Sequence, residues 1–70
     1  MIEVLLVDDH AVVRAGYRRM LEAMPDISVV EAEDCESSLS QVKKQRFDVY
    51  VLDLTLPGVS GLETMRRILA

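Results

Sequence analysis

The sequence is poor in cysteine and in long apolar runs, and each scarcity excludes a class of protein. Cys35 is the single cysteine, so the chain can form no internal disulfide and has no cysteine spacing typical of a metal site. A reducing, cytoplasmic setting is therefore expected. The apolar runs are far shorter than the roughly 20 residues that cross a bilayer. Acids within the first nine residues argue against a signal peptide.

Basic residues are also scarce, which limits the partners that the chain can attract by charge. Eight lysines and arginines stand against twelve aspartates and glutamates, giving a net charge of -4 at pH 7. That balance argues against direct binding to nucleic acid or to an anionic membrane, and it favours a cation or a basic partner. Half of the 70 residues are hydrophobic, which is enough to fold one small domain around a core.

Two hydrophobic periodicities alternate along the chain. Short apolar runs typical of buried strands cover residues 2–7, 27–32 and 48–53. Amphipathic helices are expected over residues 10–24, over 35–46 and from 61 onwards. Asp34 is the expected cap of the second helix, and Ser60 with Glu63 forms a capping-box pair for the third. The order βαβαβα predicts an α/β fold, a doubly wound parallel sheet with helices on both faces.

Apolar side chains at helical spacing predict which helix faces pack inward. These residues are Val13, Tyr17, Met20, Leu21 and Met24 on the first helix, Leu39 and Val42 on the second, and Leu62, Met65 and Leu69 on the third. Three arginines of the first helix are expected in solvent, namely Arg14, Arg18 and Arg19. Cys35 and Tyr50 are expected to be structural residues of the core.

The acids at the strand ends are the candidate functional residues. Asp8 and Asp9 follow the first strand, and Asp53 follows the third. Carboxyl ends of parallel strands lie at one edge of the sheet, so the three carboxylates converge if these strands are neighbours. Converging carboxylates repel one another, and a hard divalent cation such as Mg2+ removes the repulsion. One carboxylate is then available as a nucleophile toward a phosphoryl group.

The residues around these acids resemble those of a known family. IEVLLVDDH at residues 2–10 and VLDLTLPGVSGLE at residues 51–63 are similar to the receiver domain of two-component response regulators. DDHAVVRAGYRRML at residues 8–21 resembles the NarL/FixJ subgroup, whose receivers precede a LuxR-type helix-turn-helix DNA-binding domain. The resemblance covers all 70 residues. It implies a flavodoxin-like (CheY-like) fold with strand order 2-1-3.

By this resemblance the chain is a phosphoacceptor signalling domain rather than an enzyme. Asp53 is the residue that accepts a phosphoryl group from a sensor histidine kinase, with Mg2+ as the cofactor. Asp8 and Asp9 form the acidic pair that holds the metal, with Asp9 the direct ligand. Asp53 and the backbone carbonyl of Thr55 complete the expected ligand set.

The resemblance also assigns structural roles and predicts what lies outside the sequence. Pro57 and Gly58 shape the turn after the acceptor, and Gly61 opens the next helix. A complete receiver has five strands and roughly 120 residues. Residues 1–70 are therefore expected to be a truncated receiver, without the fourth and fifth βα units and without the DNA-binding domain. The third strand, residues 48–53, is then an unpaired apolar edge, through which a homodimer or strand-exchanged oligomer is expected.

Two other functions stay open on the sequence alone. A haloacid-dehalogenase-like phosphatase also places an aspartate after an apolar strand, but its D-x-D motif needs an acid where this chain has Thr55. A non-phosphorylated interaction or dimerisation module, which uses the receiver fold without its chemistry, is the stronger alternative. His10 is expected to start the first helix rather than to bind metal.

Overall fold

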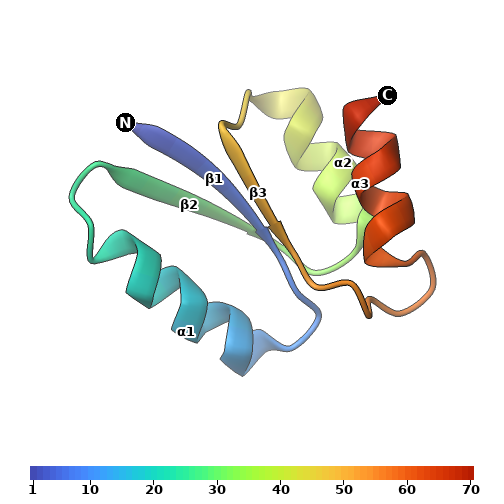
Figure 1. The fold of residues 1–70 in the computed structure, drawn as a ribbon, viewed down its shortest axis with the longest axis horizontal. Helices are drawn as coiled ribbons and strands as arrows, with labels where there is room; N and C mark the ends of the chain where they lie inside the picture. The colour runs from blue at the N-terminus through green and yellow to red at the C-terminus, as the bar shows by residue number, and fades with distance from the viewer.

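The computed structural model describes residues 1–70 as a three-stranded parallel sheet with helices on both faces (Figure 1). The strands are β1 (Ile2–Val7), β2 (Ile27–Ala32) and β3 (Val49–Leu52), and the helices are α1 (Ala11–Glu22), α2 (Cys35–Lys44) and α3 (Gly61–Leu69). The sheet order is β2-β1-β3, which confirms the predicted 2-1-3 arrangement. Helix α1 covers one face, while α2 and α3 lie together on the other (Figure 1). None of the helices has the length and apolar character that crossing a membrane requires.

Strand β1 is central because its sequence suits burial on both faces. It pairs in parallel with β2 on one side and with β3 on the other. Residues 4–7 are all hydrophobic, and none is more than 3% exposed. A continuous apolar run of this kind is typical of a strand covered on both faces, whereas a strand with one solvated face alternates.

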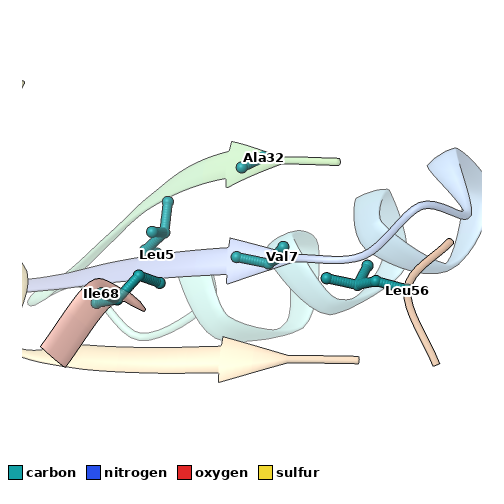
Figure 2. Close-up of a cluster of buried hydrophobic side chains, with 5 residues drawn as sticks. All are labelled: Leu5, Val7, Ala32, Leu56 and Ile68. Carbon is teal, nitrogen blue, oxygen red and sulfur yellow. The ribbon is translucent and has the colours of Figure 1, made fainter. Parts of the chain in front are cut away.

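The larger core lies between the sheet and the pair α2 and α3. Its buried members come from two strands, the loop after β3 and the last helix, namely Leu5, Val7, Ala32, Leu56 and Ile68 (Figure 2). The predicted inward residues of α2, Leu39 and Val42, pack against this cluster, as does Tyr50. Cys35 is buried at the start of α2, in agreement with a structural role.

The α1 side of the sheet has a smaller core, and here the prediction was largely wrong. The cluster consists of Val4, Leu6 and Val29, and Leu21 is the residue of α1 that packs against it. The other expected inward residues of α1 are between 46% and 63% exposed, namely Val13, Tyr17, Met20 and Met24. Helix α1 lies chiefly over β2, and no second helix on this face meets the rest of its apolar stripe.

Helix α3 is rotated relative to the predicted helix. Leu62 and Leu69, expected inward, are 71% and 69% exposed. The buried positions are Gly61, Thr64 and Ile68, which lie at helical spacing on another face. The hydroxyl of Thr64 donates to the Ser60 carbonyl at 2.8 Å, so this polar side chain is buried without losing a hydrogen bond. The hydrophobic pattern predicts the face that carries Leu62 and Leu69. It misses the buried face because Thr64, a polar residue, occupies a central position on it.

The helix caps agree better with the sequence. Asp34 caps α2, its Oδ1 accepting a hydrogen bond from the third helical residue at 2.8 Å. Ser60 caps α3 by accepting from the Glu63 amide at 3.2 Å, but the capping box is only half formed. The Glu63 carboxylate binds Arg66 and Arg67 instead, and these arginines lower the pKa of Glu63 to about 2. The element ends lie within two residues of the predicted ones.

Substitutions at two adjacent residues test which face of α3 packs against the core. Ile68→Ala should lower the free energy of unfolding by about 2–5 kcal/mol, because it leaves a cavity in the larger core. Leu69→Ala should change it by less than about 0.5 kcal/mol, because that side chain is 69% exposed. Urea titrations followed by circular dichroism measure both values. A larger loss for Leu69→Ala than for Ile68→Ala would contradict the observed packing.

Candidate functional site

The three acids predicted to converge do lie together at one edge of the sheet. Val7 and Leu52 are partners in the β1–β3 register, so the residues that follow them leave the sheet side by side. The Asp53 amide donates to the Val7 carbonyl at 2.9 Å and fixes this arrangement. One ligand atom from each of Asp8, Asp9, His10 and Asp53 lies within 4.8 Å of all the others. The parallel pairing thus joins residues that are 45 positions apart.

The acids of the β1 loop differ in how their oxygens are satisfied. The Asp8 side chain is 10% exposed, and its Oδ1 accepts from the His10 amide at 2.8 Å. The Asp9 side chain is 29% exposed, yet its Oδ1 is buried and has no hydrogen-bond partner. A buried carboxylate oxygen without a donor is costly. Asp9 is therefore the carboxylate that most needs a cation.

His10 lies among the acids, a position that the sequence analysis did not predict. It is the N-cap residue of α1, as expected. Its Nδ1 lies 3.2 Å from Oδ1 of Asp8, 3.1 Å from Oδ1 of Asp9 and 3.9 Å from Oδ2 of Asp53. The approach to Asp9 lacks hydrogen-bond geometry, so it leaves that oxygen unsatisfied. The available signal was a histidine directly after two strand-end acids.

Thr55 holds one oxygen of the candidate acceptor. Its amide and its hydroxyl donate to Oδ1 of Asp53 at 2.9 and 2.8 Å. These two bonds, the backbone one foremost, hold the pKa of the Asp53 carboxyl below its ordinary value, and the nearby imidazole of His10 adds to the effect. Asp53 is accordingly ionised at neutral pH. Both hydrogen bonds go to Oδ1, which leaves Oδ2 open toward the cluster.

The turn after Asp53 is anchored to the larger core. Leu56 is 6% exposed and belongs to that core, and its side chain points toward Val7 and so holds the loop against the core (Figure 2). Pro57 is exposed and precedes Gly58, whose φ of 72° lies in the left-handed region. Glycine adopts that conformation without the steric cost that other residues meet. This is the tight turn that Pro57 and Gly58 predict.

Gly61 allows α3 to approach the backbone of Asp53 closely. Its amide donates to the Leu54 carbonyl at 3.3 Å. A Cβ at this position would meet the Asp53 carbonyl oxygen, and it would lie 2.7 Å from the Leu54 Cα and 3.0 Å from the Asp53 carbonyl carbon. Only glycine fits there without moving the chain segment that carries Asp53.

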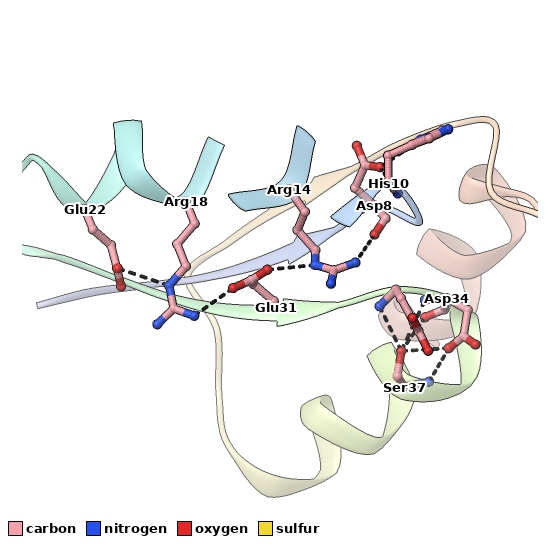
Figure 3. A network of polar contacts seen from close by, with 9 residues as sticks. Asp8, His10, Arg14, Arg18, Glu22, Glu31, Asp34 and Ser37 are labelled. Atoms are coloured by element: carbon pink, nitrogen blue, oxygen red, sulfur yellow. Dashed lines mark hydrogen bonds and ion pairs between the residues drawn. The ribbon is translucent and has the colours of Figure 1, made fainter. Parts of the chain in front are cut away.

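Two of the arginines expected in solvent are instead bound to acids (Figure 3). Arg14 donates from Nε to Glu31 at 2.7 Å and from Nη1 to the Asp8 carbonyl at 2.6 Å. Arg18 donates to the other Glu31 oxygen at 2.7 Å. Arg19 is exposed, as predicted. The overlooked signal was Glu31, the one charged residue of β2, on the sheet face that α1 covers.

Comparison with known proteins identifies the class to which this fold and site belong. Residues 4–70 match the response regulator receiver domain, so the chain belongs to that family. It is 46% identical over 69 residues, 97% of its length, to the response regulator UvrY of Escherichia coli strain K12. It is 43% identical over 70 residues to the response regulator GacA of Pseudomonas syringae pv. syringae. The chain spans about a third of the length of these relatives, 32% and 33%.

Solved structures agree with this assignment. A two-component response regulator of the LuxR family from Aurantimonas sp. SI85-9A1 is 45% identical with a TM-score of 0.88, and the match covers 94% of this chain and 48% of that one. A complex of the histidine kinase ThkA with the response regulator TrrA matches with a TM-score of 0.87 at 31% identity, covering 97% and 58%. The predicted CheY-like fold and the NarL/FixJ resemblance are thereby confirmed.

The close approach at Gly61 gives a prediction with a matched control. Gly61→Ala should lower the free energy of unfolding by more than about 1 kcal/mol, because the added Cβ collides with the backbone of Asp53 and Leu54. Gly16→Ala, inside α1 with nothing within 4 Å of its Cβ, should raise it by about 0.5–1 kcal/mol. Thermal unfolding followed by circular dichroism compares the two. Equal effects would show that the contact at Gly61 is unimportant.

Proposed function

We propose that this chain carries the phosphoacceptor site of a two-component response regulator. In this proposal Asp53 accepts a phosphoryl group from a histidine kinase, with Mg2+ bound by the acids beside it. The supporting observation is the convergence of the Asp8, Asp9 and Asp53 carboxylates within 4.8 Å at the ends of two paired strands. Membership of the receiver family supports the same assignment.

The residues present fit a magnesium ion. Asp9 offers a buried carboxylate oxygen with no donor, and oxygen ligands of this kind are those that Mg2+ prefers. We assign the ion to Asp8, Asp9, Asp53 and the Thr55 backbone carbonyl. Bound there, Mg2+ supplies neutralisation of the charge on the phosphoryl group and on the acceptor.

The two carboxylate oxygens of Asp53 have different roles in the proposed phosphoryl transfer. Thr55 occupies Oδ1 with two hydrogen bonds, so Oδ2 is the oxygen that attacks phosphorus. The new bond joins Oδ2 to phosphorus while the bond between phosphorus and the imidazole nitrogen of the kinase phosphohistidine breaks. The electron pair stays on that nitrogen, which takes up a proton. The product is an acyl phosphate on Asp53.

The proposed partners follow from the relatives rather than from this chain alone. A receiver at 31% identity has been solved in complex with a histidine kinase, which supports a kinase as the phosphoryl donor. We further propose that residues 1–70 act in the cytoplasm as the receiver of a transcription regulator with a helix-turn-helix domain, and the match to a LuxR-family response regulator supports this role. The net charge of -4 gives residues 1–70 no electrostatic attraction for DNA. The phosphatase alternative loses its support. That reaction needs a general acid two residues after the nucleophile, and this position holds Thr55, whose hydroxyl donates to Asp53.

Acetyl phosphate tests the acceptor chemistry directly. Incubation with acetyl phosphate and Mg2+ should add a single phosphoryl group, because Oδ2 of Asp53 is open and the carboxyl is ionised. Intact-mass spectrometry should show the adduct on the wild-type chain and its absence on Asp53→Asn and in the presence of EDTA. Asp48→Asn, which changes an exposed acid directly before β3 and at the opposite end of that strand from Asp53, is the matched control and should retain the adduct. An adduct that survives Asp53→Asn would overturn the assignment.

A second candidate function is self-association, which the unpaired edge of β3 and an apolar groove beside it favour. The outer edge of β3 is unpaired in the sheet, and Val49 and Val51 beside it are 44% and 38% exposed. A groove of about 400 Å³ between β3 and α1 is lined mainly by apolar side chains, including Val13 and Tyr17. A second copy is the proposed occupant, because antiparallel pairing of two β3 edges about a two-fold axis is self-complementary.

Light scattering across a concentration series tests this association. The wild-type chain should form dimers, and Val51→Lys should shift it toward monomer, since a lysine on an edge strand opposes pairing with another edge. Val12→Lys is the control, because Val12 is 86% exposed on α1 and does not line the groove. A wild-type chain that stays monomeric at the highest concentration would exclude self-association.

A further inference from the structure

We propose that Arg14 is a positioning residue for the acidic cluster. It acts through the Asp8 carbonyl and holds the segment of Asp8 and Asp9 in the geometry that binds a divalent cation. This inference rests on the proposed phosphoacceptor function and adds a residue outside its ligand set. The juxtaposition that carries it is one guanidinium shared between a strand carboxylate and the loop of the site (Figure 3).

The guanidinium of Arg14 makes two directed contacts at once. Nε donates to Oε1 of Glu31 at 2.7 Å, and Nη1 donates to the Asp8 carbonyl at 2.6 Å. The side chain is only 18% exposed, so both contacts are partly shielded from water. A planar guanidinium can hold two acceptors in fixed directions, whereas the ammonium of lysine is a compact point charge. The arrangement therefore uses the shape of arginine as well as its charge.

The anchor at Glu31 is itself held in place. Arg18 donates to the second Glu31 oxygen at 2.7 Å, and it also donates to Glu22 at 3.1 Å. The other Glu22 oxygen accepts from the Val29 amide at 3.0 Å. The two arginines keep Glu31 ionised by lowering its pKa, Arg18 foremost. The network thus runs from β2 along α1 to the acidic cluster (Figure 3).

The Asp8 carbonyl is a sensitive point for the site. The Asp8 amide donates to the Ala32 carbonyl at 3.1 Å, so β2 already fixes one side of the residue. Arg14 fixes the other side, at the peptide unit that joins Asp8 to Asp9. That unit is planar, so holding its oxygen also sets the direction in which the Asp9 residue leaves β1. Asp9 is the residue whose buried oxygen lacks a donor.

Metal binding by matched variants separates positioning from general stability. Isothermal titration calorimetry with MgCl2 gives the Kd for Mg2+ of the wild-type chain, of Arg14→Gln and of Arg18→Gln. Each protein is measured at a temperature at which it is folded. Arg14→Gln should weaken Mg2+ binding by about tenfold or more, the range typical of residues that orient metal ligands. Arg18→Gln loses an ion pair to the same Glu31 but has no contact with Asp8, so it should weaken Mg2+ binding clearly less than Arg14→Gln does.

A second readout keeps the inference testable without metal. In amide NMR spectra of the metal-free chain, Arg14→Gln should shift the Asp9 and His10 signals further than Arg18→Gln does, because only Arg14 contacts the Asp8 carbonyl. Arg14→Lys, which retains the charge, should still weaken Mg2+ binding severalfold, because an ammonium group lacks the planar guanidinium that holds Glu31 and the Asp8 carbonyl in fixed directions. This variant carries the test if Arg14→Gln fails to fold.

The outcomes distinguish the positioning role of Arg14 from the proposed Mg2+ site on which it rests. A wild-type chain that binds no Mg2+ would overturn the metal site and the inference together. A wild-type chain that binds Mg2+, with Arg14→Gln and Arg18→Gln equally impaired or equally unaffected, would overturn the role of Arg14 and leave the metal site standing. A lysine variant indistinguishable from wild type would also overturn it, because charge alone would then suffice.

Discussion

The parallel pairing of β1 between β2 and β3 is the constraint on which the rest of this structure depends. A strand buried on both faces and paired on both edges cannot slip without breaking the hydrogen bonds to both neighbours and repacking its side chains in both cores. With Val7 fixed opposite Leu52, the acids that follow each strand have to emerge together. The hydrophobic core therefore assembles a cluster of like charges that would not gather on its own.

Like charges held this close require compensation, and the chain supplies part of it. His10 places one ring nitrogen among the acids, and Thr55 gives two donors to Asp53. These contacts stabilise particular oxygens and leave others open, notably Oδ1 of Asp9. A site that satisfied every oxygen internally would have no affinity for a cation. In the proposed function, the oxygens that the chain leaves open are the ones available to a divalent cation.

The sequence predicted the parts of this structure that depend on strong local patterns. The uniformly apolar run at residues 2–7 predicted the buried central strand, and the positions of Asp8, Asp9 and Asp53 predicted where the acids meet. The burial of helix faces was less predictable, because Tyr17 looks like a core residue until the packing against the sheet is known. The partners of Arg14 were not predictable from helical spacing alone, since Glu31 lies 17 residues away on a strand. Propensity and periodicity place elements, whereas tertiary contacts decide which residues each element presents.

The two strand ends that form the site are supported from opposite faces of the sheet. Asp53 is fixed from the side of α2 and α3, where Leu56 enters the core and Gly61 lets α3 meet the backbone. Asp8 is fixed from the side of α1, where Arg14 holds its carbonyl. A disturbance in one layer would therefore displace either Asp53 or the pair Asp8 and Asp9 rather than the whole cluster. The distance between Asp53 and the pair Asp8 and Asp9 is thus sensitive to the packing of both layers, although none of the three acids belongs to a helix.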